Sequence, residues 1–310
     1  MTLSVVSTLY KSKNFLEEFI EVIEKSIEEL AIEKYELVFV NDGSPDESVD
    51  YLLELQENNN RIKVIDLSRN FGHHYAIQAG LKYATGDYVF LIDNDLEVSP
   101  DVLLTFFQEI KDDENLDVVY GYQENRKGSF LEKYLGKLFW ILINKLSDTK
   151  IPHNILTERL MTKKYVEALL SLNDANLFLG GMMHWVGFQQ KGIPIKKRQR
   201  QGQSTYSFRK RAELMLQAIT SFSGKPLVYL FYFGITISIF SVIFIVYLIV
   251  RKLIYMDEVQ IGWTSLVAVS IFILGILSTF LGIIGIYLYK VFIQVQGRPN
   301  AIVKRVYEKK

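Results

Sequence analysis

The chain contains no cysteine among its 310 residues. It therefore cannot form a disulfide framework, a thiolate metal site or a cysteine nucleophile, and nothing in its composition indicates secretion or thiol redox chemistry. A net charge is missing as well, because 35 basic residues balance 35 acidic ones. The N-terminus, MTLSVVSTLYKSKNF, has no basic region followed by a long apolar core, so we expect no cleavable signal peptide.

Charge is also absent from two long runs near the C-terminus. Residues 227–250 and 259–289 contain no charged side chain, and each run exceeds the roughly 20 residues that cross the hydrocarbon core of a bilayer. Buried helices of a soluble protein are the alternative, which the length of the runs disfavours. We therefore predict a transmembrane helix in each run.

The residues that flank the two runs are mostly basic, and cationic flanks favour the cytoplasm. This pattern predicts a multi-pass protein of the inner membrane, with a cytosolic domain of residues 1–225 and a basic cytoplasmic tail of residues 290–310. Residues 129–147 and 208–224 are candidates for helices in the membrane interface, although ordinary packing helices would have the same pattern. The basic run KKRQRQ precedes a predicted span, where cations attract anionic lipid, so we expect no nucleic-acid partner.

The first 225 residues alternate between strand and helix patterns. Apolar, β-branched runs predict strands at residues 3–8, 35–42, 61–68, 88–93 and 116–122. Helical spacing predicts helices after Asn14, at residues 74–84 and after Pro100. This order predicts an α/β domain with a Rossmann-like, mostly parallel sheet that binds its ligand beyond the carboxyl ends of its strands. Where a dehydrogenase has Gly-X-Gly-X-X-Gly, the chain reads STLYKSKN, which disfavours a nicotinamide cofactor.

Three carboxylates, Asp93, Asp95 and Glu97, follow directly on the apolar run YVFLI. Side chains at i and i+2 of an ending strand point to one side, and crowding them raises their pKa values and costs stability. A divalent cation removes that penalty, and Mg²⁺ typically takes one or two carboxylates and leaves its other positions to water and phosphates. The cluster therefore indicates a metal site that bridges a diphosphate, although solvated loop acids would look the same.

Six stretches follow one another along the chain: FVNDGSPDES, IDLSRNFGHHYAIQAGLKYATGDYVFLIDNDLEVSPD, DVVYGYQENRKG, ERLMTKKYV, SFSGKPL and GIYLYKVFIQVQGRPNAIV. Together they resemble family 2 glycosyltransferases of the polyprenyl-phosphate type, which include dolichyl-phosphate mannosyltransferases and bacterial undecaprenyl-phosphate glucosyltransferases. The resemblance implies a GT-A fold and the inverting transfer of a sugar from a nucleotide diphosphate, UDP in particular, to a lipid phosphate at the membrane surface.

The resemblance also implies roles for residues on the donor side. Tyr10, Asp42 and Asp93 match positions that bind the nucleotide sugar. Asp93 and Asp95 match the family's Asp-X-Asp, and with Glu97 they are the expected ligands of Mg²⁺ or Mn²⁺. Glu97 stands where many relatives have glutamine, so it adds a negative charge.

Further residues match catalytic positions that meet phosphate. Asp95 and Arg126 are expected to act on the donor diphosphate, and Arg159, Arg200 and Ser204 to hold the phosphate of the polyprenyl acceptor. Two further positions depart from the family pattern: Thr157 replaces an acid sometimes proposed as a base, and Gly180 replaces a common arginine. These departures surround the sugar and the acceptor.

Two other functions remain open at the level of the sequence. One is a catalytically silent membrane scaffold of the same fold, and the other is a small processive polysaccharide synthase, which would need more spans to line a channel. A homo-oligomer also remains open. His73 and His74 would point about 100° apart on a helix, so a shared metal is disfavoured, and helix capping or surface polarity is favoured over catalysis.

Overall fold

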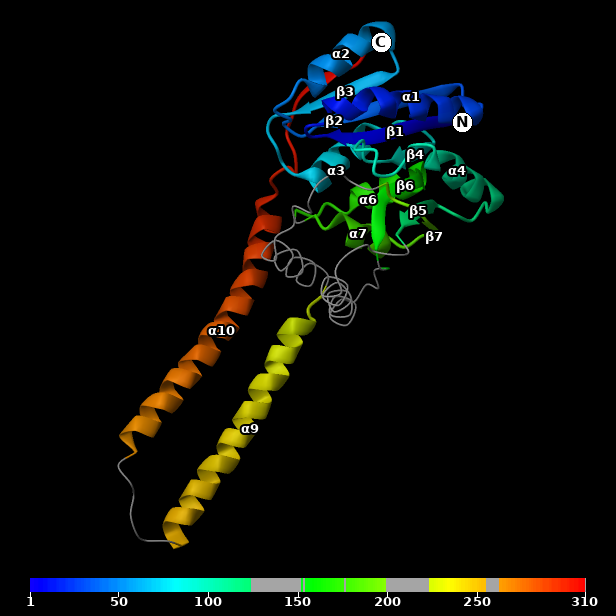
Figure 1. The fold of residues 1–310 in the computed structure, drawn as a ribbon. Coiled ribbons are helices and arrows are strands. Elements are labelled where there is room, and N and C mark those ends of the chain that lie inside the picture. Colours follow the sequence, from blue (N-terminus) through cyan, green and yellow to red (C-terminus); the bar gives the residue numbers. More distant parts are fainter. Residues whose placement is uncertain (124–151, 153, 176, 199–222, 255–261, 310) are drawn as a thin grey trace.

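The computed structural model describes residues 1–123, 152, 154–175, 177–198, 223–254 and 262–309. In these residues, eight strands form one sheet in the order β7-β5-β6-β4-β1-β2-β3-β8 (Figure 1). The strands are β1 Thr2–Leu9, β2 Lys34–Asn41, β3 Ile62–Leu67, β4 Tyr88–Leu91, β5 Val118–Tyr122, β6 Ile155–Thr162, β7 Gln190–Pro194 and β8 Val303–Tyr307. The helices are α1 Lys13–Glu29, α2 Ser48–Asn58, α3 His73–Tyr83, α4 Val102–Asp112, α6 Lys163–Ser171, α7 Leu179–Trp185, α9 Lys225–Ile254 and α10 Trp263–Gln296.

The centre of the sheet is parallel, as predicted. β1 pairs in parallel with β2 and β4, and β2 pairs in parallel with β3. β6 runs antiparallel to β4 and β5, and β8 runs antiparallel to β3. Since the chain goes from β1 to β2 and β3 on one side and then returns to β4 on the other, the carboxyl ends of β1 and β4 form a topological switch point, where sheets of this kind bind ligands.

Two apolar cores cover the two faces of the sheet. On one face, Leu16, Phe19, Ile23 and Ile27 recur at helical spacing along α1 and pack with side chains of α4. On the other face, α3, α6 and α7 bury their apolar side chains against the same strands. Three predicted helix starts differ slightly: α1 begins at Lys13, one residue before the predicted cap, α3 begins at His73, one residue before the predicted start, and α4 begins two residues after Pro100.

β6 lies outside the predicted strands. Glu158 and Arg159 interrupt its apolar sequence, yet they are only 1% and 2% exposed. A charged pair in a fully buried strand is rare, because charges are almost never buried without partners. The pairing of β6 with β4 and β5 is therefore a tertiary feature that local sequence preference does not indicate.

Two long helices, α9 and α10, project from the sheet domain (Figure 1). α9 covers the first uncharged run predicted to span a membrane, and α10 covers the second run from Trp263 onward. Among the described residues, one stretch, Phe272–Gln296 in α10, is long and apolar enough to cross a bilayer. The second span, at residues 227–250, stays a prediction.

The predicted basic tail at residues 290–310 has a defined structure. Its first residues extend α10, which ends at Gly297 in the left-handed conformation with φ of 59°. The chain then returns to the sheet as β8. There the ammonium group of Lys63 lies 2.9 Å from carboxylate oxygens of both Glu36 and Glu308. The sheet domain therefore includes residues from both ends of the chain.

Candidate active site

The loop after β2 is held tightly to the start of α3. The Asp42 carboxylate accepts hydrogen bonds from the backbone N–H groups of Phe71 and Gly72, at 2.7 and 3.0 Å. Gly43 has φ of 62°, and a Cβ there would lie 2.5 Å from the backbone nitrogen of Asn70. Only glycine fits this close approach. In the described structure, Asp42 thus positions α3, and its predicted contact with the nucleotide stays a prediction.

This arrangement brings His73, the first residue of α3, to the ends of β1 and β4. Its Nδ1 lies 3.1 Å from Thr8 Oγ1, and its Nε2 lies 3.5 Å from Asp93 Oδ1. Burial lowers the pKa of His73, while Asp42 and Asp95 oppose that shift. His74 turns away and approaches the carbonyl oxygen of Leu177, at 3.3 Å.

The predicted acid cluster lies in the turn after β4. Burial, together with the neighbouring Asp95, raises the pKa of Asp93 to about 6. Asp95 Oδ1 accepts a hydrogen bond from the Glu97 N–H at 3.0 Å. The turn itself contains Leu96 at a positive φ of 57°. Glu97 Oε2 lies 2.9 Å from the ammonium group of Lys197, so its charge is partly compensated.

Strand β6 brings two further charges to the same region. Its register pairs Arg159 with Leu91, which places Thr157 near Asp93. The Glu158 side chain is buried, and burial with the nearby charges of Asp93 and Asp95 raises its pKa to about 7.

Arg159 lies on the other face of β6. Its guanidinium group donates to the carbonyl oxygens of Thr157 and Leu156, each at 3.1 Å. It is 2% exposed, and burial lowers its pKa, while the nearby Tyr165, Glu158 and Tyr120 oppose that shift.

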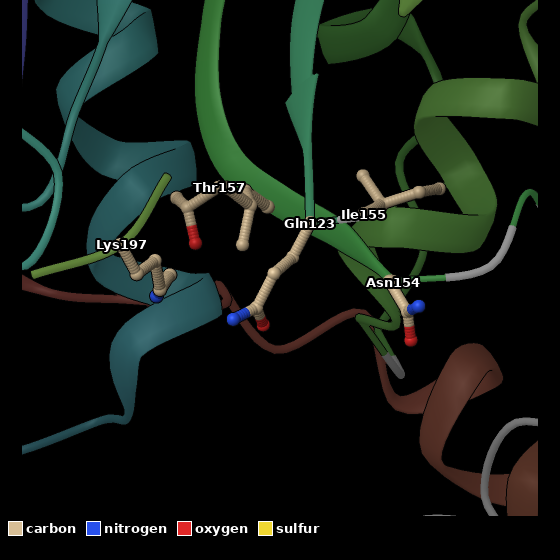
Figure 2. A pocket seen from close by; sticks show the side chains of 6 residues that line it. Gln123, Asn154, Ile155, Thr157 and Lys197 are labelled. Carbon is tan, nitrogen blue, oxygen red and sulfur yellow. The ribbon is translucent and has the colours of Figure 1, made fainter. Parts of the chain in front are cut away.

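A pocket of about 230 Å³ lies beside the acid cluster. Figure 2 shows the side chains of Lys197, Thr157 and Gln123 gathered around it. Its other lining residues are Asn154, Ile155 and Leu156. The pocket is mainly polar and lies at the start of β6.

The structure brings some predicted site residues together. Asp93, Asp95 and Glu97 share one turn, whereas Tyr10 is 53% exposed just beyond β1. The predicted residues Arg126, Arg200 and Ser204 lie outside the described residues.

Three residues at the site were missed by sequence reasoning: His73, Glu158 and Lys197. His73 reaches Asp93 only through the fold, and Lys197 belongs to a basic run that also suits a membrane flank. Glu158 carried no local signal, because the charged pair Glu158–Arg159 interrupts the strand pattern and its burial is visible only in the fold.

The oxygen atoms of the acid cluster are of the kind that bind divalent cations. Asp93 and Asp95 offer hard carboxylate oxygens, and Glu158 Oε2 has no hydrogen-bond partner among the described residues. In that same part of the chain, no three acids or histidines already lie close enough to hold one ion. Mg²⁺ or Mn²⁺ would therefore take its remaining ligands from water and from substrate phosphates. Glu97, predicted as a third ligand, forms an ion pair with Lys197, and its role as a ligand stays a prediction.

Comparison with known proteins gives a consistent result. Residues 4–170 match the glycosyl transferase family 2. A protein of Mycobacterium tuberculosis (strain CDC 1551 / Oshkosh) described as a glycosyltransferase is 38% identical over 308 residues, which cover 99% of this chain and 89% of the relative. The SfII prophage-derived bactoprenol glucosyl transferase of Shigella flexneri is 30% identical over 307 residues, which cover 98% of each chain.

Among solved structures, the mannosyltransferase PcManGT from Pyrobaculum calidifontis in complex with GDP-Man and Mn²⁺ is similar, with 17% sequence identity and a TM-score of 0.48. The match covers 71% of this chain and 63% of that protein. A similarity this distant assigns no ligand to the site.

Proposed function

This chain is a glycosyltransferase that belongs to family 2, and from that premise we propose that it transfers a sugar, with inversion, from a UDP-sugar to undecaprenyl phosphate. The observation that carries the proposal is the extent of the similarity to a bactoprenol glucosyl transferase, which includes both the sheet domain and the apolar helices α9 and α10. The product would supply a sugar for modification of cell-envelope glycans or glycolipids.

On the donor side, we assign the diphosphate to the turn after β4. Bound Mg²⁺ or Mn²⁺ would offset charge on the leaving diphosphate, as such ions do in phosphate sites. Asp95 and Asp93 would hold that ion, Tyr10 and Asp42 would face the nucleoside, and Arg126 would contact a phosphate. His73 supports Asp93 from the other side, since its Nε2 lies 3.5 Å from the carboxylate.

On the acceptor side, anchoring matters more than deprotonation. A phosphate monoester has a second pKa near 6, so it is largely dianionic at pH 7 and attacks without a protein base. This agrees with Thr157, which cannot take a proton from an acceptor at this pH. Arg200 and Ser204 would grip the phosphate oxygens. Arg159 is buried and donates to the backbone carbonyl oxygens of Thr157 and Leu156, so we assign it a positioning role for the part of β6 that carries Thr157.

The proposal includes an arrangement in the membrane. Both α9 and α10 would cross the inner membrane, and both termini and the sheet domain would lie in the cytoplasm. Residues 129–147 and 208–224 would lie at the membrane interface. This places the acceptor phosphate, which is confined to the bilayer surface, on the same side as the nucleotide sugar.

A product assay with purified full-length protein tests the proposal. We expect one nucleotide sugar from a panel, with undecaprenyl phosphate and Mg²⁺ or Mn²⁺, to yield a lipid carrying a single phosphate and a single sugar by mass spectrometry. A polymeric product would support a processive synthase, and no product with any donor would support a scaffold.

The Asp95→Asn variant tests the assignment of the donor site. Loss of one charged ligand should reduce turnover at least about a hundredfold, as does loss of one electrostatic stabiliser elsewhere. The Asp101→Asn variant is the matched control, because Asp101 is exposed in the same turn region and makes no side-chain capping bond. Full activity in excess chelator, or equal effects of the two variants, contradicts the assignment.

A further inference from the structure

Glu158 is a buried ionisable side chain, one of whose carboxylate oxygens has no partner among the described residues. It lies in the interior of β6 and is 1% exposed, and its Oε2 has no hydrogen-bond partner among the described residues. Glutamates are almost never fully buried unless they are paired, because removing the charge from water is costly. The side chain therefore calls for an explanation outside the packing of the sheet.

A second strand glutamate shows what a structurally satisfied carboxylate looks like in this protein. Glu36 accepts hydrogen bonds from the Ser4 hydroxyl, from Thr85 and from the ammonium group of Lys63. These donors lower its pKa in spite of burial. Glu158 has no comparable set of donors, and its pKa moves the other way. Glu158 is thus not held in place by the protein as Glu36 is.

Charges of both signs surround Glu158, and the neighbouring Arg159 is one of the two cations among them in the described part of the chain. Asp93 and Asp95 both act on it unfavourably, and Lys197 acts on it favourably. The ammonium group of Lys197 already lies 2.9 Å from Glu97 Oε2. Four carboxylates therefore share the one lysine that the described structure places among them. A divalent cation beside Asp93 and Asp95 would restore the balance.

We propose that Glu158 is an additional carboxylate of the divalent-cation site, where its unpartnered oxygen and its charge strengthen binding of the ion held by Asp93 and Asp95. This inference rests on the proposed function, because it presupposes that the turn after β4 binds an ion. The inference adds to the proposed function a role for a residue of β6, the strand that pairs with β4 just before that turn. Glu158 is buried, and its burial protects the added charge from screening by solvent.

Metal binding, rather than activity, tests this role directly. Full-length protein in detergent is titrated with Mn²⁺ in the presence of saturating UDP, and free Mn²⁺ is measured by electron paramagnetic resonance. The Glu158→Gln variant keeps the shape of the side chain and removes its charge, and its Kd for Mn²⁺ should rise about 10- to 100-fold, as for other residues that support metal ligands. The Glu167→Gln variant, which removes an exposed charge on α6, should bind Mn²⁺ as the wild type does.

Two further variants separate the failure of this inference from the failure of the proposed function. If Asp95→Asn weakens Mn²⁺ binding while Glu158→Gln stays within twofold of the wild type, the role of Glu158 is refuted and the metal site stands. If neither variant changes the Kd, the metal site itself is refuted. Glu158→Asp keeps the charge but shortens its reach, so its Kd should fall between those of the wild type and Glu158→Gln. If Glu158→Gln does not fold, a wild-type Kd for Glu158→Asp overturns the inference.

Discussion

Lys63→Met should destabilise the sheet domain strongly. Lys63 lies on β3 with its side chain 8% exposed, and its ammonium group bridges Glu36 on β2 and Glu308 just after β8. Methionine fills much of the same space but removes the charge. Glu36, whose side chain is 16% exposed, would then keep a carboxylate without its cation.

The size of the effect follows from the burial of the two partners. Breaking a buried pair by removing one partner costs about 3–5 kcal/mol. The hydrogen bonds from Ser4 and Thr85 to Glu36 remain, so we expect about 3 kcal/mol for Lys63→Met. Glu308 is 52% exposed, and exposed pairs contribute about 0–1 kcal/mol, so Glu308→Gln should have a small effect.

Thermal unfolding of the full-length protein in detergent, followed by intrinsic fluorescence, measures both changes. At about 2–4 °C per kcal/mol for a domain of this size, Lys63→Met should lower Tm by about 6–12 °C and Glu308→Gln by less than about 4 °C. Lys34→Met, which removes an exposed lysine at the start of β2, is the control. A Tm for Lys63→Met within 2 °C of the control refutes the reasoning. Equal losses for Lys63→Met and Glu308→Gln would refute the ranking.

Three further predictions follow from the site and the membrane helices. Burial and the charge of Arg159 lower the pKa of His184 to about 4. The neutral imidazole therefore contributes its full stability above about pH 6.5, and this contribution is lost as the pH falls toward about 4. Between these pH values, the Tm of His184→Gln should fall less steeply than that of the wild type. Thr157→Ala should keep kcat within about tenfold of the wild-type value, a change in barrier of roughly 1.4 kcal/mol. Complete loss of activity in this variant would indicate a direct catalytic role for Thr157. In intact cells, an impermeant thiol reagent should label Asp257→Cys, between the predicted spans, but not Asn60→Cys on the sheet domain; the reverse pattern contradicts the topology.

The central strands were predictable because their signal is local. β1 to β4 are short, apolar and β-branched, and acids follow β4 directly, so the sequence indicates both the parallel sheet and the acid cluster at its edge. His73 meets Asp93 only because Asp42 fixes the start of α3 across the sheet. No pattern within α3 indicates that contact.

The strands that local patterns do not indicate are those formed by long-range pairing. β8 pairs with β3 after the chain has passed through both apolar helices, and its sequence, VKRVY, suits a basic tail equally well. β6 holds Glu158 and Arg159 in a buried strand because cations and acceptors from the fold offset part of the cost: Arg159 donates to carbonyl oxygens of its own strand, and the charge of Lys197 favours the carboxylate of Glu158. Such compensation becomes visible only in three dimensions.

The return of the chain to the sheet also bears on how a lipid acceptor would reach the site. The end of α10 is tied to the sheet domain through Gln294, whose side chain bonds the backbone of Asn173 and Ala175. Beyond α10, Asn300 donates to the buried Gln78 of α3, the helix that begins with His73. The apolar helix and the helix that carries a site residue are thus joined by hydrogen bonds as well as by the chain. Since a lipid phosphate cannot leave the bilayer surface, such a connection would fix the height of the site above the membrane, so that the acceptor meets the donor without a large movement of the domain.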